Sequence, residues 1–330
     1  MKMKKAANNR FFRNLPRYFL LIATILLMLL FYALTPSFLQ VLNLMNILRT
    51  ASIYGILAIG YATVIMTGDM NFSFSSQAAL AAVVTGLLLK GWPDAYLTCA
   101  LIAVLCSVVI GFLPAFFVIH LKVPSFIATM GFMTVFTGLL KVLTNNTILF
   151  SNAWGNRYAL PANMTIFGMI PLPVVVFIVI AIIAHLFFEK SRTGRYLFAI
   201  GASKTTCQQV GINEKRIRYI GFSICSACSG IGGVLYGAML GQATPLMGSD
   251  LILPIIAITM VSATFYSIGK YNVPGIVMSS IIMIVVQNGV IGLGLEAWAK
   301  DVSQGLMLVI AVGIIARVRK DGLPKVTFGN

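Results

Sequence analysis

The chain has 330 residues, of which 59% are hydrophobic and 10% are charged, and its net charge at pH 7 is +16. With a mean hydropathy of +0.94, it lies far outside the range of soluble globular proteins. The composition therefore excludes a soluble domain and predicts an all-α polytopic membrane protein. Because so much positive charge would also suit a nucleic-acid-binding protein, the positions of the basic residues have to decide between the two.

Ten apolar runs approach or reach the length of about 20 residues that a helix needs to cross a bilayer. The first follows a basic head and lacks a small-residue cleavage motif, so it predicts a retained span rather than a signal peptide. The transmembrane domain is then residues 17–317, between a basic N-terminal segment, residues 1–16, and a tail, residues 318–330. The predicted spans are residues 17–35, 45–67, 74–90, 96–119, 124–143, 167–188, 219–240, 251–269, 273–294 and 302–317.

An even number of spans places both termini on the same side of the membrane. Most Lys and Arg residues fall in the segments on that side, and because cytoplasmic loops carry the excess of Lys and Arg, both termini are predicted to be cytoplasmic. Topology then accounts for the positive charge, so membrane lipid is an expected partner and nucleic acid is not. The basic residues left on the other side are Arg49, Lys90, Lys141, Arg157 and Lys300.

The longest polar interval is the predicted cytoplasmic loop 189–219, which contains seven of the basic residues. Its middle, residues 202–210, is polar on nearly every side and lies between Gly201 and Gly211. This pattern predicts a short exposed helix with a glycine stop at each end. Because so short a helix is marginal alone, we interpret it as a docking element that needs a partner surface.

Two polar segments, which we call the first and second breaks, separate corresponding pairs of spans. Residues 67–76 separate the second span from the third, and residues 241–250 separate the seventh from the eighth. The predicted topology places the first break on the cytoplasmic side and the second outside. Spans two to five and seven to ten therefore run in opposite orientations, as an inverted repeat requires.

The chain lacks the patterns expected of an enzyme or an ion-coupled carrier. All eight acidic residues lie in predicted loops or at span ends, whereas ion-coupled carriers hold ionisable groups at mid-membrane depth. No cluster has the spacing of a metal site or a catalytic nucleophile, and Cys225 and Cys228 are interpreted as small residues that pack on a helix. We therefore expect no catalytic residue, no metal and no nucleotide site, and an ion-coupled secondary transporter remains the alternative of a different class.

A path without intramembrane charge suits a neutral polar solute that makes brief hydroxyl and amide contacts. Each such side chain has a second interpretation, because hydroxyls and amides in membrane helices also satisfy backbone groups. The residues predicted to line or border the path are Asn71, Phe72, Ser75, Gln77, Phe126, Thr129 and Asn288.

Several motifs together carry a family resemblance from about residue 43 to residue 317. They are NILR at 46–49, GILAIG at 55–60, VPSFIATMG at 123–131, TGRY at 193–196 leading into AIGA at 199–202, and GIN at 211–213 followed by Arg216. In this order the chain resembles the membrane permease of a bacterial ABC importer, in the ribose, xylose and galactose branch of the family that includes branched-chain amino acid permeases. The resemblance implies a type II importer fold in the bacterial inner membrane, with a second permease, two cytoplasmic ATP-binding subunits and an external solute-binding protein.

The resemblance also implies that residues 202–212 match the family's coupling helix, which docks in a groove of the ATPase. ATP would be bound and hydrolysed by the partner subunits, and no cofactor is expected in this chain. The coupling residues expected on this basis are Gly201, Ala202, Ser203, Gln208, Val210, Gly211 and Ile212.

The first break departs from the pattern TGGIDLSVGS that is usual in this family. The customary Asp is Asn71, and two glycines are replaced by Asp69 and Ser75. The glycine-rich segment between the eighth and ninth spans is also altered, at residues 262–272. A monosaccharide is the expected solute, with a nucleoside, a furanone-type signal or a branched-chain amino acid as alternatives, and a more typical permease is expected to pair with this one in a heterodimer.

Overall fold

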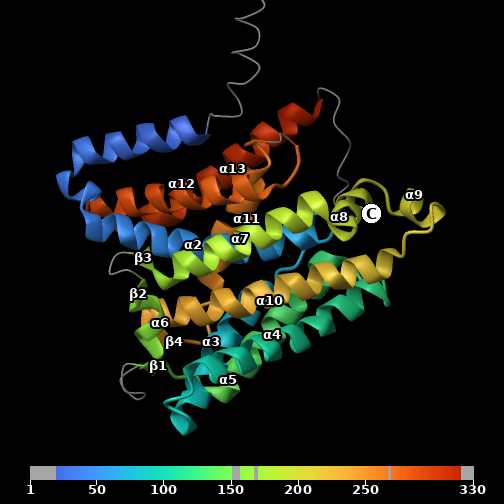
Figure 1. Ribbon diagram of the computed structural model, residues 1–330, viewed down its shortest axis with the longest axis horizontal. Coiled ribbons are helices and arrows are strands. Elements are labelled where there is room, and N and C mark those ends of the chain that lie inside the picture. Colours follow the sequence, from blue (N-terminus) through green and yellow to red (C-terminus); the bar gives the residue numbers. More distant parts are fainter. Residues whose placement is uncertain (1–19, 151–156, 167–169, 267–268, 321–330) are drawn as a thin grey trace, which may run out of the picture. The chain divides into compact units, whose positions relative to one another are not determined.

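The computed structural model describes residues 20–150, 157–166, 170–266 and 269–320, and these are mainly helical (Figure 1). The predicted all-α fold class is confirmed. Residues 1–16 and the tail beyond residue 320 lie outside the described part. The helices are Leu20–Leu34, η1 (Pro36–Leu39), α2 (Val41–Ile65), α3 (Phe74–Gly91), α4 (Tyr96–Ile119), α5 (Ser125–Leu143), η3 (Arg157–Ala159), α6 (Leu160–Asn163), α7 (Leu172–Lys190), α8 (Arg192–Ala202), α9 (Lys204–Gln209), α10 (Glu214–Leu240), η4 (Ser249–Leu251), α11 (Ile252–Ser262), α12 (Val273–Gly292) and α13 (Ala297–Lys320).

One helix occupies each of the ten apolar runs that the sequence predicts as spans. In the described part of the chain, seven helices are long and apolar enough to cross a membrane, namely α2, α3, α4, α5, α7, α10 and α12. The first and eighth runs hold shorter apolar helices, Leu20–Leu34 and Ser249–Ser262, and α13 occupies the tenth. Helix positions are thus largely as predicted, while the inverted repeat stays a prediction.

The eighth predicted span, residues 251–269, is too long. The helix ends at Ser262, and the chain then turns through Tyr266 and Gly269, whose φ angles are +60° and +84°. Asn272 fixes this turn, because its amide nitrogen donates to the carbonyls of Ser262 (3.1 Å) and Phe265 (2.8 Å). Its amide oxygen accepts from the Gly275 amide (2.7 Å) and so caps the start of α12.

The described part of the chain forms two compact units, one from residues 20–51 and 256–320 and the other from residues 52–255. In the first unit α12 packs on α13, and the ring of Phe31 lies against Gly289, where no side chain stands between them. The amide of Asn43 donates to the amide oxygen of Asn288 at 2.9 Å. This unit therefore holds one of the predicted path residues, Asn288.

In the second unit α10 packs along α3 and α4 (Figure 1). Glycines make this possible, because Gly233 lies directly on the backbone carbonyl of Ala78 in α3. Gly60 of α2 likewise leaves room for Cys225 and Cys228 of α10, which pack directly against it. This confirms that the two cysteines are packing residues. Small residues at such spacing allow helix backbones to approach closely in membranes.

The second break leads from α10 to η4 and is tied to the segment before α7. Gly241, with a φ of +64°, ends α10, and β4 (Gln242–Ala243) pairs antiparallel with β1 (Leu149–Phe150). A second pair joins β2 (Thr165–Ile166) to β3 (Ile170–Pro171). The first of these pairs joins the second break to the segment that precedes α7.

Candidate functional site

The first break, between α2 and α3, places one carboxylate in the interior of the second unit. Asp69 is only 3% exposed, although it lies in a loop. The guanidinium of Arg218 binds it with two hydrogen bonds, from Nε to Oδ2 at 2.7 Å and from a terminal nitrogen to Oδ1 at 3.0 Å. The Thr67 hydroxyl donates to Oδ2 at 3.1 Å. Bidentate pairing of this kind combines charge neutralisation with a fixed orientation.

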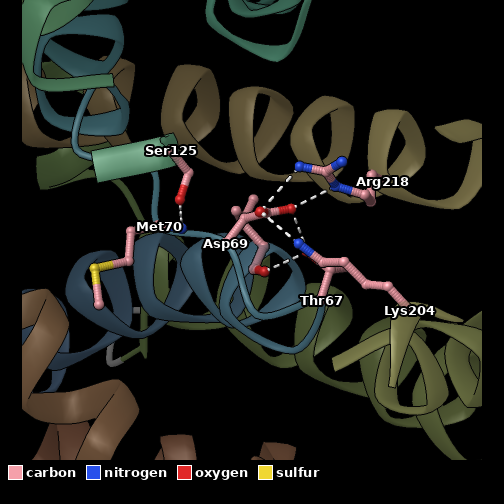
Figure 2. A network of polar contacts seen from close by, with 7 residues as sticks. Thr67, Asp69, Met70, Ser125, Lys204 and Arg218 are labelled. Atoms are coloured by element: carbon pink, nitrogen blue, oxygen red, sulfur yellow. Dashed lines mark hydrogen bonds and ion pairs between the residues drawn. The ribbon is translucent and has the colours of Figure 1, made fainter. Parts of the chain in front are cut away.

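A second cation reaches the same carboxylate from the predicted docking loop. Lys204 is the first residue of α9, and its Nζ lies 3.4 Å from Oδ1 of Asp69 (Figure 2). The Lys204 side chain is 41% exposed, whereas those of Arg218 and Asp69 are 8% and 4% exposed. Lys204 therefore forms the weak, solvent-screened arm of the cluster, and Arg218 forms the strong one. We call Asp69, Arg218 and Lys204 the ion-pair cluster.

The other flank of the first break is fastened to the start of α5. The amide of Met70 donates to the Ser125 hydroxyl (3.1 Å), and the amide of Phe72 donates to the Thr129 hydroxyl (3.1 Å). The Thr129 hydroxyl in turn donates to the Ser125 carbonyl at 2.7 Å. The break thus connects three elements: α9 and α10 through Asp69, and α5 through two hydroxyls.

The docking loop contains two helices where one was predicted. The sequence predicts a single short helix over residues 202–210, but α8 continues to Ala202 and α9 starts after Ser203. Ser203 separates them because its extended backbone and its side chain, which accepts from the Thr206 amide at 3.2 Å, make it a helix N-cap. Gly201 therefore lies inside α8 and is not a helix stop, so that part of the prediction is wrong.

Gly201 has a different role, since it lies against the end of α2 and the beginning of the first break. A Cβ atom at this position would overlap the carbonyl oxygen of Met66. The contact is between two backbones, so neither side can move aside as a flexible side chain would. The absence of a side chain at Gly201 is what lets α8 approach the end of α2 at this point.

Gly211 is a helix stop, as predicted. Its φ is +79°, its amide donates to the Gln208 carbonyl (3.0 Å), and the Ile212 amide donates to the Cys207 carbonyl (2.9 Å). These two bonds form the Schellman motif that commonly ends helices at a glycine. Among the other predicted coupling residues, Ala202, Gln208 and Val210 are exposed, while Ser203 and Ile212 are half-buried.

Substitution of Gly211 should therefore act through backbone strain alone, because nothing lies within 4 Å of a Cβ built there. Alanine or valine in the left-handed conformation costs about 1–2 kcal/mol, whereas asparagine tolerates it. We expect Gly211→Val to speed limited trypsin cleavage of the loop in the purified chain by roughly 5- to 30-fold. Gly211→Asn should stay near the wild-type rate, and equal rates for the two variants would contradict this account.

Six of the seven predicted path residues lie in the second unit, and several fasten the first break. Asn71 is fully buried, and its amide oxygen accepts from the amide (3.1 Å) and hydroxyl (2.6 Å) of Ser73. Thr129 is buried in the contact with Phe72 described above. Phe72 and Phe126 pack edge to face with their ring centroids 5.3 Å apart, and Phe126 is 50% exposed.

The remaining path residues are Ser75 and Gln77, in the second unit, and Asn288, in the first. Ser75 is buried and donates to the Phe72 carbonyl at 3.0 Å. Gln77 donates to the Ser73 hydroxyl at 3.0 Å, and its amide oxygen is buried without a hydrogen-bond partner among the described residues. Asn288 belongs to the other compact unit. The role of all seven residues in a solute path stays a prediction.

A cavity of about 530 Å³ opens beside the ion-pair cluster. Asp69, Arg218 and Lys204 contribute to its wall, and so do the α4–α5 turn and the first residues of α10. The lining residues are Gly68, Asp69, Met70, Val118, Ile119, Lys122, Val123, Pro124, Ser125, Phe126, Lys204, Glu214, Lys215 and Arg218.

Sequence reasoning missed the ion-pair cluster. In the sequence, Asp69 is one of several carboxylates in predicted loops. Lys204 and Arg218 are two of the seven basic residues in the loop 189–219. Asp69 and Arg218 are 149 positions apart, and no pattern in a single sequence pairs them. The available signal was the departure from the usual family motif, in which glycine stands where this chain has Asp69.

The chain is similar to permease components of transport systems over most of its length. A family model described as "Branched-chain amino acid transport system / permease component" matches residues 43–312. The ribose import permease protein of Escherichia coli strain K12 is 27% identical over 300 residues, which cover 88% of this chain and 91% of that protein. The xylose transport system permease protein of Haemophilus influenzae is 26% identical over 360 residues, which cover 91% of this chain and 96% of that protein.

One solved structure resembles the fold. It is an inward-facing conformation of an ABC transporter assigned to the metal-chelate type, with a TM-score of 0.51 and 13% sequence identity. The match covers 90% of this chain and 98% of that chain. At this identity the likeness concerns the fold alone.

Proposed function

Because the chain belongs to the family of permease components of branched-chain amino acid transport systems, we propose that it is the membrane subunit of an ATP-driven importer for a monosaccharide. It is a multi-pass membrane protein and a transport subunit, and ATP hydrolysis belongs to a separate subunit of such systems. The observation that carries the proposal is the direct link from the exposed helix α9 to the first break through Lys204 and Asp69.

This link suggests how movement of an ATPase would reach the transport path. An ATPase that binds α9 would move Lys204 when it changes conformation. Helix α8 would move together with α9 and would push on the first break where Gly201 contacts it. Asp69 transmits the displacement to α10 through Arg218, and the hydroxyls of Ser125 and Thr129 pass it to the start of α5. Packed contacts with few alternative arrangements are suited to such transmission.

A monosaccharide is the proposed solute for two reasons. The relatives described above are named as ribose and xylose permeases, and the predicted path residues are neutral hydroxyl, amide and aromatic side chains. The family description names branched-chain amino acids, so these stay an alternative, together with a nucleoside or a furanone-type signal. The neutral path disfavours a zwitterion, whose two charges would need partners.

An ion-coupled carrier is the alternative from another class, and the described carboxylates do not favour it. Asp69 is committed to Arg218 and Lys204, and the other acidic residues of the described chain lie in loops or near helix ends. A carrier of this kind would need an ionisable group free to bind its ion within the membrane.

The proposed assembly contains two cytoplasmic ATP-binding subunits, which bind the ATP, an external solute-binding protein and a second permease. The second permease would be a copy of this chain or, as the altered glycine motifs suggest, a different one. We place the assembly in the bacterial inner membrane with both termini in the cytoplasm, because the basic loop 189–219 and the basic ends then share one side.

Reconstitution with partner subunits tests the proposal. The chain is expressed with the ATPase and binding-protein genes of its own locus, purified, and assayed for ATP hydrolysis in lipid with a panel of sugars and amino acids. We expect a binding protein loaded with a monosaccharide to stimulate hydrolysis and one offered leucine or isoleucine not to do so. Solute uptake by the purified chain alone, driven by an ion gradient, would overturn the proposal.

A further inference from the structure

The cavity beside the ion-pair cluster is lined by more positive than negative charge. Its cations are Lys122, Lys204, Lys215 and Arg218, and its anions are Asp69 and Glu214. Lys204 and Arg218 are already paired with Asp69. Lys122 and Lys215 are exposed, and neither has an ion-pair partner among the described residues. Two cations are therefore available to an anion that enters the cavity.

Part of the cavity lining is apolar, and further apolar side chains near it in the sequence are exposed. This apolar part comes from the end of α4, the turn after it and the start of α5, and consists of Val118, Ile119, Val123, Pro124 and Phe126. These two helices and the turn between them expose further apolar side chains: Phe116 is 46% exposed, Leu121 54% and Ile127 62%. In a membrane protein such surfaces contact lipid acyl chains. The cavity thus presents cations next to a surface suited to acyl chains.

We propose that this cavity binds the headgroup of an anionic phospholipid, with its phosphate between Lys122 and Lys215. Basic pockets beside membrane helices on the cytoplasmic side are suited to anionic headgroups. Acyl chains attached to the phosphate lie along the exposed side of α4 and α5. A zwitterionic headgroup gains less, because its own cation is repelled by the same lysines.

Charge and apolar surface together favour a lipid over the other occupants. The solute proposed above is neutral and would not use two lysines. A free phosphate ion would use the lysines but not the apolar wall. An acidic segment of the ATPase would likewise leave the exposed surfaces of Phe126 and Ile127 uncovered.

A bound phosphate would also act on the ion-pair cluster. Lys204 lines the same cavity, is 41% exposed and makes the longer of the two ion pairs with Asp69. A phosphate group therefore competes with Asp69 for Lys204, while Arg218 keeps its two hydrogen bonds. Anionic lipid would in this way loosen the contact between α9 and the first break without opening the buried pair.

Native mass spectrometry of the purified full-length chain tests the site. The probes are phosphatidylglycerol and phosphatidylcholine with identical acyl chains, titrated separately. Lys122→Ala/Lys215→Ala is the test variant, and Lys90→Ala/Lys141→Ala is the matched control, because it removes the same charge away from this cavity. At about 1 kcal/mol for each basic residue near an anionic surface, the test variant should bind phosphatidylglycerol roughly 25-fold more weakly. The control should bind it as the wild type does.

Four results would overturn the proposal. One is equal binding of phosphatidylglycerol and phosphatidylcholine by the wild type, and another is an equal loss of phosphatidylglycerol in the test and control variants. The third is binding of soluble glycerol phosphate with the same lysine dependence and similar strength, which would assign the cavity to a free phosphate. The fourth is a test variant that binds lipid as the wild type does but no longer co-purifies with the ATPase. This result would assign the cavity to the ATPase and not to a lipid. Because lipid binding is measured on the chain alone, its outcome does not depend on the proposed solute.

Discussion

Replacing Gly201 by valine is expected to abolish ATP-driven uptake while leaving the chain in the membrane. The added Cβ overlaps the Met66 carbonyl, so α8 and the first break have to separate. Overpacking of this kind costs about 1–3 kcal/mol, and the shift falls at the contact that the proposed mechanism uses. Alanine carries the same Cβ and should already lower uptake, with valine more severe because its two further methyl groups need more space.

Uptake of the labelled solute by cells that express the complete transporter measures this effect. Gly305→Val is the matched control, because Gly305 is also helical but nothing lies within 4 Å of a Cβ built there. Membrane abundance of each variant, measured by immunoblot, separates uncoupling from loss of the protein. Normal uptake by Gly201→Val at normal abundance would show that the contact between α8 and the first break is not needed for coupling.

The helices were predictable because each apolar run approached or reached the length that a bilayer demands. Their ends were less predictable, as the eighth span shows. The sequence beyond Ser262 stays largely apolar through Tyr266, yet the helix stops there. The cause is Asn272, whose amide binds two carbonyls of the turn and whose oxygen caps the next helix. A local composition window does not detect a side chain ten positions away.

The candidate site was harder to predict, because it depends on contacts between distant segments. Gly211 could be recognised, since its role is local and follows from its own φ angle. Gly201 could not, because its role is to leave room for the Met66 carbonyl in another loop. Asp69 presents the same difficulty, since a loop carboxylate is ordinarily exposed and its burial depends on Arg218. The roles of Gly201 and Asp69 both depend on a residue that is distant in the sequence and adjacent only in the folded chain.

Asp69→Asn is expected to lower both the stability and the coupling of the transporter. The amide keeps the shape of the carboxylate but leaves the guanidinium of Arg218, 8% exposed, without its counter-charge. Breaking a buried ion pair by removing one partner costs about 3–5 kcal/mol. We therefore expect a clear fall in the apparent melting temperature of the purified chain, together with lost stimulation of the ATPase by the loaded binding protein.

Two further variants separate stability from coupling. Lys204→Met removes the exposed arm of the ion-pair cluster, so its effect on stability should stay within about 1 kcal/mol. If the link from α9 to the first break transmits movement, this variant still loses ATPase stimulation while it melts like the wild type. Asp69→Asn/Arg218→Gln removes both buried charges and should recover much of the lost stability, because no unpaired charge remains. Recovery of stimulation in this double variant would show that the pair only holds the fold together, since the charged link would then be dispensable for coupling.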